Sequence, residues 1–321
     1  MSSDLVLAGP ASVEALRSVA LEAEDYIRSA RARNTQRAYR SDWSAFCSWC
    51  DSRALPSRPA QPETVALYLA DQAKTLSVAT LERRLSAIAQ AHRSARLDSP
   101  TRSGLVRDVL AGIRRRHRTE QVGAAPLLLE DLRIMLGAIP DDQAGLRDRA
   151  LLLVGFAGAF RRSELVALDV VDLEFRRAGL VVHLRRSKTD QGGAGQQKGI
   201  PHGAHPETCP VRALRAWLQA AGIQEGPVFR RVHRGGRVGT ARLCDRAVAQ
   251  IIQRRASAAG LDPERLSGHS LRAGLATQAA ADGVEEREIM AQTGHRSVQM
   301  VRRYIRDGQL FRGNAAGRVG L

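Results

Sequence analysis

Apolar side chains in the first third of the chain recur at helical spacing. Thr35 is the expected N-cap of a first helix, Pro62 opens a shorter one, and Ser77 and Thr101 start two more. Four helices without an alternating strand pattern predict a compact helical domain over residues 26–118. The stripe of the first helix consists of Tyr39, Trp43, Phe46, Cys47 and Cys50.

Periodicity is lost over residues 119–126, which end in Gly and Pro, so this segment is the predicted linker. In the second domain, 127–321, residues 170–175 and 180–184 have strand patterns on either side of a short turn. The fold class is therefore mainly α: a helical N-terminal domain, then a mostly helical C-terminal domain with a small antiparallel β-sheet. Its helices are predicted over 129–139, 144–158, 210–221, 241–259, 270–281, 286–292 and 297–306.

Length and charge support two domains and a polyanionic partner. A chain of 321 residues exceeds what one hydrophobic core usually organises. The formal net charge is +16, from 49 Lys+Arg against 33 Asp+Glu, and cations that neutralise phosphates release counterions. The alternative is a soluble protein that is merely rich in arginine. Residues 1–25 hold one arginine against five acidic residues, so this acidic tail is not expected to bind DNA.

Four cysteines, at 47, 50, 209 and 244, do not form a disulfide framework in a chain of this length. Cys47 and Cys50 fall on the apolar stripe without a second pair or a nearby histidine, so we interpret them as packing residues and expect no metal site. No run of about 18 apolar residues and no signal-peptide order occurs. We therefore expect a cytoplasmic, nucleoid-associated protein without membrane contact.

The second domain carries the residue types that metal-free attack on a phosphodiester requires. Arginine forks neutralise the non-bridging oxygens as charge builds in the transition state. A phenol needs nearby cations and a base to become a nucleophile, and a lysine of lowered pKa can protonate the leaving oxygen. The residues of these types, in order, are Arg161, Lys188, His269, Arg272, His295 and Tyr304.

These residues stand in motifs that resemble the active site of tyrosine recombinases, the phage-integrase family, and the resemblance covers roughly residues 30–312. The family usually has Gly-Leu-Arg where this chain has Ala-Phe-Arg. The motifs are Ala159-Phe160-Arg161-Arg162-Ser163-Glu164-Leu165, Ser187-Lys188-Thr189, Gly268-His269-Ser270-Leu271-Arg272, and Thr293-Gly294-His295 with Tyr304 nine residues further on.

The resemblance implies a role for each residue. Arg161, favoured over its neighbour Arg162 by its spacing to Ser-Glu-Leu, would bind the scissile phosphate, and Glu164 would orient an arginine or support the fold. Lys188 would be the general acid on a β-hairpin, with Lys198 across the loop as its rival.

Arg272 would be the second phosphate-binding arginine in the same resemblance. His269 would take the tyrosine proton, and His295 would hydrogen-bond the scissile phosphate. Tyr304 would attack it, and the three other tyrosines all lie in the N-terminal region.

The activity that the resemblance implies is site-specific cleavage and rejoining of duplex DNA through a 3′-phosphotyrosine. Bond energy is conserved in such an exchange, so neither ATP, metal nor organic cofactor is expected. The expected partners are duplex DNA and copies of this chain, as a homo-tetramer on DNA, with a monomer in solution and an accessory directionality factor left open. Residues 305–321 could dock on a neighbouring subunit or on their own.

Clustered arginines of the N-terminal domain are candidates for contact with DNA. A basic cluster is often only a solvated patch, but next to a linker in a basic chain it favours contact with backbone phosphates. These residues are Arg83, Arg84, Arg114, Arg115 and Arg116.

Three alternatives remain. A type IB topoisomerase would use the same residues on a single duplex, and an accessory DNA-binding protein would keep the fold without turnover. A basic RNA-binding protein is disfavoured because aromatic residues make up only 4% of the chain. The target sequence, and the choice between integration, excision, resolution and transposition, do not follow from these residues.

Overall fold

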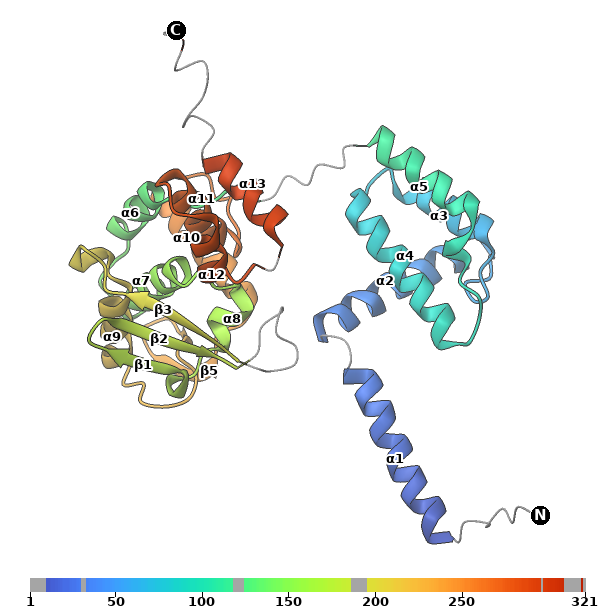
Figure 1. The fold of residues 1–321 in the computed structure, drawn as a ribbon, viewed down its shortest axis with the longest axis horizontal. Helices are drawn as coiled ribbons and strands as arrows, with labels where there is room; N and C mark the ends of the chain where they lie inside the picture. Colours follow the sequence, from blue (N-terminus) through green and yellow to red (C-terminus); the bar gives the residue numbers. More distant parts are fainter. Residues whose placement is uncertain are drawn as a thin grey trace. The chain divides into compact units, whose positions relative to one another are not determined.

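The computed structural model describes residues 10–29, 33–117, 124–185, 195–295 and 297–308, together with residue 319. The chain divides into two compact units, Met1–Val122 and Gly123–Leu321 (Figure 1). The division falls within residues 119–126, the segment where the sequence loses its periodicity. The two units are considered separately below as unit 1 and unit 2.

The described residues of unit 1 form helices joined by turns and contain no strand. Phe46, Tyr68, Leu81 and Ile88 are completely buried at its centre, and they come from three different helices. Its helices are α1 (Pro10–Ser29), α2 (Arg33–Asp51), α3 (Pro62–Gln72), α4 (Val78–Ser94) and α5 (Gly104–Arg116).

Two of these helices begin where the sequence predicts, and two begin at other residues. α3 begins at Pro62 as predicted, and the Ser77 hydroxyl accepts a hydrogen bond from the Thr80 amide at 3.3 Å to cap α4. α2 begins at Arg33, so Thr35 lies in its first turn. The prediction that Thr101 starts the fourth helix is wrong, because residues 100–102 form a 3₁₀ turn and Ser103 is the cap of α5.

The acidic N-terminal region contains a helix that the hydrophobic pattern did not reveal. α1 follows residues 1–9, which lie outside the described part of the chain. Leu16, Val19, Leu21 and Tyr26 on this helix are all more than half exposed. The periodic signal in the sequence is weak because charged residues are interspersed with the apolar ones.

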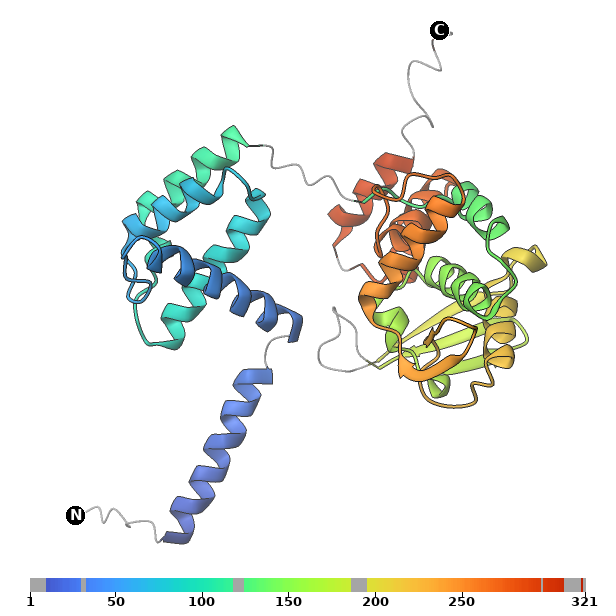
Figure 2. The same cartoon turned by 180° about the vertical axis from the view of Figure 1, so that it is seen from behind.

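Unit 2 packs helices around α7, most of whose residues are buried. In Figures 1 and 2, the β1–β2–β3 sheet lies towards one end of unit 2 and α13 towards the other. Its helices are α6 (Leu129–Gly137), α7 (Gln143–Ala157), α8 (Arg162–Ala167), α9 (Pro210–Ala220), α10 (Asp245–Ala258), α11 (Ser270–Ala281), α12 (Glu286–Thr293) and α13 (Val298–Gly308).

The small antiparallel sheet has the order β1-β2-β3. It consists of β1 (Leu173–Arg176), β2 (Gly179–Leu184) and β3 (Gln196–Pro201), and Lys198 on β3 pairs with Val182 on β2. Residues 170–172, predicted as strand, form a 3₁₀ turn instead. A second hairpin, β4 (Arg230–Val232) with β5 (Val238–Arg242), was not predicted, because its strands are short and rich in arginine.

No helix in the described ranges is both long and apolar enough to cross a bilayer. All four cysteines are free thiols; Cys50 and Cys209 are buried and Cys47 is partly buried. Burial raises the pKa of Cys50 to about 11, as expected for a thiol used in packing.

Candidate active site

The turn between α7 and α8 presents Arg161. Gly158 ends α7, and a Cβ there would lie 2.1 Å from the ring of Phe160, so only glycine allows that ring to pack. Ala159 follows with φ +45°, a conformation that residues with a side chain rarely adopt. Strained backbone of this kind is retained where the surrounding structure imposes it, and here it directs the chain into Arg161.

Glu164 fixes Arg161 from the first turn of α8. Its carboxylate accepts a hydrogen bond from the Arg161 amide at 3.0 Å and from Arg161 Nη1 at 2.5 Å. Glu164 is 5% exposed, which places the ion pair at the edge of the core. The neighbouring Arg162 instead forms an ion pair with Asp245 at 3.3 Å, and its side chain is half exposed.

Arg272 is the most deeply buried cation of the site, with an exposed fraction of 1%. It lies in the first turn of α11, and its Nη1 donates to the carbonyl oxygen of Ala159 at 2.8 Å. Its Nε and Nη2 have no hydrogen-bond partner among the described residues. Burial and the charge of Arg161 lower the pKa of Arg272 to about 10, while Glu164 opposes them.

His295 is held by the turn that ends α12. Gly294 adopts the left-handed conformation, with φ +65°, and so stops the helix. The hydroxyl of Thr293 donates to the Ile289 carbonyl at 2.6 Å and accepts from His295 Nδ1 at 2.8 Å. This arrangement selects the imidazole tautomer that carries its proton on Nδ1, so that Nε2 of the neutral ring carries none.

Cations surround His295. Burial, followed by the charges of Arg272 and Arg161, lowers its pKa to about 4. The imidazole is therefore neutral near pH 7 in the protein alone. An anion placed among the two arginines would offset their charge and raise this pKa.

Tyr304 on α13 lies against both histidines. Its hydroxyl is 2.9 Å from His269 Nε2, and its ring is 5.8 Å from that of His295. One face of α13 packs on α11 and α12 through Val301, Ile305 and Ala280. This packing carries the tyrosine to the site from the most C-terminal described helix.

The two candidate lysines differ in what the structure describes. Lys188 lies in residues 186–194, outside the described residues. Lys198 is 3% exposed, and its Nζ donates to the carbonyl oxygens of Gly158 at 2.7 Å and Gln292 at 2.6 Å. Burial and the charge of Arg272 lower its pKa to about 7.

The structure thus brings Arg161, His269, Arg272, His295 and Tyr304 together from the start of α8, the start of α11 and the α12–α13 region. Two residues of the site were not singled out from the sequence: Thr293, whose hydroxyl sets the His295 tautomer, and Gln292, whose carbonyl accepts from Lys198. Thr293 could have been found, since it stands two residues before the histidine. Among the described residues, no group of His, Cys, Asp or Glu side chains could hold a metal ion.

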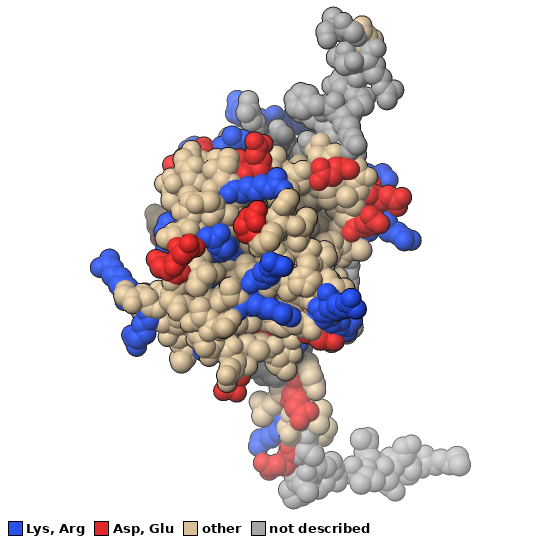
Figure 3. All heavy atoms as spheres, turned by 90° about the vertical axis from the view of Figure 1, so that its left-hand side faces the viewer, with Lys and Arg blue, Asp and Glu red and all other residues tan. Residues whose placement is uncertain are grey.

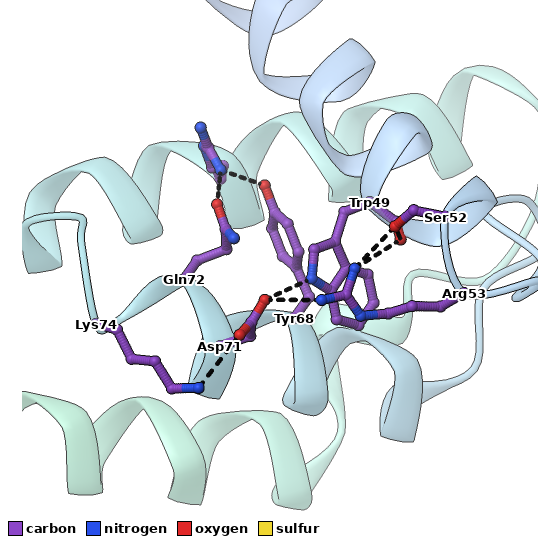
Figure 4. A network of polar contacts seen from close by, with 8 residues as sticks. Trp49, Ser52, Arg53, Tyr68, Asp71, Gln72 and Lys74 are labelled. Atoms are coloured by element: carbon purple, nitrogen blue, oxygen red, sulfur yellow. Dashed lines mark hydrogen bonds and ion pairs between the residues drawn. The ribbon is translucent and has the colours of Figure 1, made fainter.

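Two of the candidate DNA-binding arginines of unit 1 are engaged within the unit. Arg83 binds both carboxylate oxygens of Asp42, at 2.7 and 3.1 Å. Arg84 donates to the hydroxyl of Tyr68 and to the side chain of Gln72, both on α3 (Figure 4). These contacts join α2, α3 and α4, so both arginines stabilise the fold of the unit.

The cluster at the end of α5 is more open. Arg114 forms an exposed ion pair with Glu82 at 2.6 Å, whereas Arg115 and Arg116 are exposed and form no ion pair with any residue that the structure describes. On the face of unit 2 drawn in Figure 3, basic and acidic side chains are interspersed over a largely uncharged surface.

Comparison with known proteins finds relatives that cover most of this chain. Residues 127–309 match the model of the phage integrase family, and residues 24–97 match that of the N-terminal SAM-like domain of phage integrases. An integrase/recombinase XerD homologue of Selenomonas ruminantium is 39% identical over 99% of this chain and 95% of its own length. The Cre recombinase of Escherichia phage P1 is 27% identical over 83% of this chain and 80% of its own length.

Solved structures agree on the fold. A λ integrase fragment bound to a core site has a TM-score of 0.58 at 18% identity, covering 92% of this chain and 95% of that one. The XerH recombinase in a post-cleavage complex has the same TM-score and identity, covering 82% of this chain and 72% of that one. The chain belongs to the phage integrase family of tyrosine recombinases. It is a site-specific DNA recombinase, an enzyme that cleaves and rejoins DNA.

Proposed function

We propose that Tyr304 is the nucleophile of this recombinase and that the surrounding side chains divide the remaining work. The Tyr304 oxygen attacks the phosphorus of one phosphodiester, and its proton passes to His269 Nε2, which lies 2.9 Å away. The bond from phosphorus to the 5′ oxygen breaks, and this oxygen takes a proton from Lys188. The products are a 3′-phosphotyrosine and a free 5′-hydroxyl.

The two arginines bind the phosphate in this proposal. The observation that supports this role is the buried guanidinium of Arg272. Two of its nitrogens have no hydrogen-bond partner within the described residues. Leaving buried donors without partners costs stability, and a non-bridging phosphate oxygen would satisfy them. Arg161, oriented by Glu164, supplies the second fork.

His295 completes the phosphate site. In the protein alone its pKa is about 4, so it becomes a cationic donor only when an anion offsets the arginines. Because Thr293 occupies Nδ1, the proton gained is on Nε2. The site therefore gains a further donor at the moment the phosphate binds.

The substrate in this proposal is duplex DNA with two recombination sites, held by a homo-tetramer that exchanges strands in pairs. The solved relatives named above support it, since they are described in complex with a core site or with a recombination substrate. Unit 1 and unit 2 would both contact the duplex, with Arg115 and Arg116 on backbone phosphates. Each released 5′-hydroxyl attacks the phosphotyrosine of the other duplex, so the number of phosphodiester bonds is unchanged.

The test uses nicked duplexes that lose the 5′-hydroxyl strand after cleavage, so that the covalent adduct accumulates. Wild type and Tyr304→Phe are incubated with candidate sites in EDTA, and adducts are read on a denaturing gel. We expect an adduct with wild type alone. An adduct with Tyr304→Phe would show that another residue attacks.

A second duplex separates the two enzyme classes that share this chemistry. With two sites present, a recombinase yields exchanged strands, whereas a type IB topoisomerase would only relax a supercoiled circle. Tight binding without any adduct would indicate an accessory DNA-binding protein.

A further inference from the structure

Lys198 lies between two helix ends that carry residues of the active site. Gly158 is the C-cap of α7, three residues before Arg161, and Gln292 is in the last turn of α12, three residues before His295. The final carbonyl groups of a helix have no partner within it and carry its negative partial charge. The ammonium of Lys198 donates to one such carbonyl from each helix.

The side chain of Gln292 reinforces the same connection in the opposite direction. Its Nε2 donates to the Ala157 carbonyl at 2.7 Å and to the Gly199 carbonyl at 3.2 Å. Four hydrogen bonds from two side chains thus join β3, the end of α7 and the end of α12. We call this set, made by Lys198 and Gln292, the carbonyl clamp.

The lowered pKa of Lys198 would suit a proton donor, but its burial and its hydrogen bonds do not. It is 3% exposed, two of its donors are occupied by carbonyls, and its Nζ lies 5.1 Å from the centre of the Phe160 ring. It forms no ion pair with a carboxylate among the described residues. Loss of its proton leaves two N–H groups on the amine, so both carbonyl contacts survive the change.

We propose that Lys198 is a positioning residue, whose clamp sets Arg161, Arg272 and His295 in one geometry around the scissile phosphate. The link to Arg272 is Ala159, whose carbonyl accepts from that arginine and which directly follows Gly158. This proposal rests on the proposed function, because it assigns those three residues to the phosphate. It leaves Lys188 as the proton donor.

The chain offers a complete set of matched variants, since it contains only three lysines: Lys74, Lys188 and Lys198. Each is replaced by methionine, which keeps a long unbranched side chain and removes the amine. Lys74, whose side chain is 75% exposed and forms an ion pair with Asp71, is the control. Gln292→Leu removes the other half of the clamp and serves as the second variant.

Each protein is tested on nicked duplexes with either oxygen or sulfur as the bridging atom at the scissile 5′ position. A thiolate leaves without a proton, because a thiol has a pKa of ~8.5. A proton donor is therefore dispensable with sulfur, whereas correct placement of the phosphate is not. The thermal midpoint of each variant is measured first. Adduct rates and DNA affinity are then measured at a temperature below that midpoint.

For Lys198→Met we expect adduct formation to fall on the order of 10²-fold with oxygen and with sulfur alike, the size expected when reacting groups shift by about 1 Å. DNA affinity should stay close to that of wild type. Gln292→Leu should lower both rates by one common, smaller factor, and this variant decides the matter where Lys198→Met does not fold. Lys188→Met should lose activity with oxygen and regain it with sulfur, and Lys74→Met should match wild type.

Recovery of Lys198→Met with sulfur would overturn the proposal and make Lys198 the proton donor. Wild-type rates for Lys198→Met or for Gln292→Leu on both substrates would also overturn it. An adduct with wild type on oxygen is the separate test of the proposed function, so failure of one idea is not confused with failure of the other.

Discussion

The two ends of α7 show two different uses of buried arginine. Near its start, Asp148 is completely buried and receives Arg147, Arg254 and Arg255 at 2.6 to 2.8 Å. Beyond its end, Arg272 is equally buried, yet it contacts a backbone carbonyl and no carboxylate among the described residues. In the first group every arginine contacts the same carboxylate, whereas the buried guanidinium of Arg272 has donors left for a ligand.

This contrast separates a structural group from a binding group without reference to any relative. A buried carboxylate surrounded by arginines holds α7 and α10 together and offers nothing to a ligand. A buried arginine whose N–H donors have no partner lowers the stability of the fold. Such an arginine is expected where an anion binds and accepts hydrogen bonds from those donors. Changes at the two ends of α7 should therefore affect different measurements.

The largest expected effect is on stability, at the Asp148 group. Asp148→Asn removes the one carboxylate that pairs with these three guanidinium groups among the described residues, and we expect the free energy of unfolding to fall by about 3–5 kcal/mol. Thermal or urea unfolding of the full chain measures it. Asp141→Asn is the matched control: its side chain is 91% exposed, and its ion pair with Arg149 should contribute less than about 0.5 kcal/mol.

A comparable effect, but on catalysis, is expected at the other end of the helix. Arg272→Met should slow adduct formation by about 10²–10³-fold, the loss typical of one transition-state donor, while the thermal midpoint stays level or rises. Arg255→Met should do the reverse, lowering the midpoint and leaving the rate intact at a permissive temperature. Equal losses of stability in both variants would contradict the distinction between the two groups.

The surplus charge around Arg272 also predicts how stability depends on pH. Lys198 has a pKa of about 7 in the folded protein, below its ordinary 10.5, so between these values the unfolded chain binds more protons. Stability from this group is complete above pH 10.5 and is lost as pH falls towards 7. Between pH 8 and 10, wild type should gain at most about 1.4 kcal/mol per pH unit relative to Lys198→Met. Parallel pH curves for the two proteins would show that Lys198 is not buried in this way.

The sequence predicted local features of the fold well. Pro62 and Ser77 mark helix starts because a cap depends on a few neighbouring residues. α1 and the β4–β5 hairpin were missed, since charged residues are interspersed with the apolar ones in the first and the second is short and basic. The two-unit division follows from lost periodicity at residues 119–126.

The candidate site shows the same limit. The residue types and their order indicated the chemistry, and the spacing to Ser-Glu-Leu favoured Arg161 over Arg162. The partner of Arg162 was hidden, because Asp245 is far away in the sequence. The burial of Lys198 was equally hidden, because only Ile200, two residues further on, is an apolar residue on the same face of this short strand. Its burial results from two helix ends that meet only in the folded unit.

The smallest expected effect extends the contrast between paired and unpaired arginines to unit 1. Arg83 is held by both oxygens of Asp42, whereas Arg115 and Arg116 are exposed at the end of α5. If Arg115 and Arg116 each neutralise a DNA phosphate, replacement of either by Gln should reduce the slope of log affinity against log salt by about 0.9. Arg83→Gln should leave that slope unchanged and instead lower the thermal midpoint of the protein. DNA binding measured at several salt concentrations provides the slopes. A slope that falls as much for Arg83→Gln as for Arg115→Gln would mean that pairing within the unit does not keep an arginine from DNA.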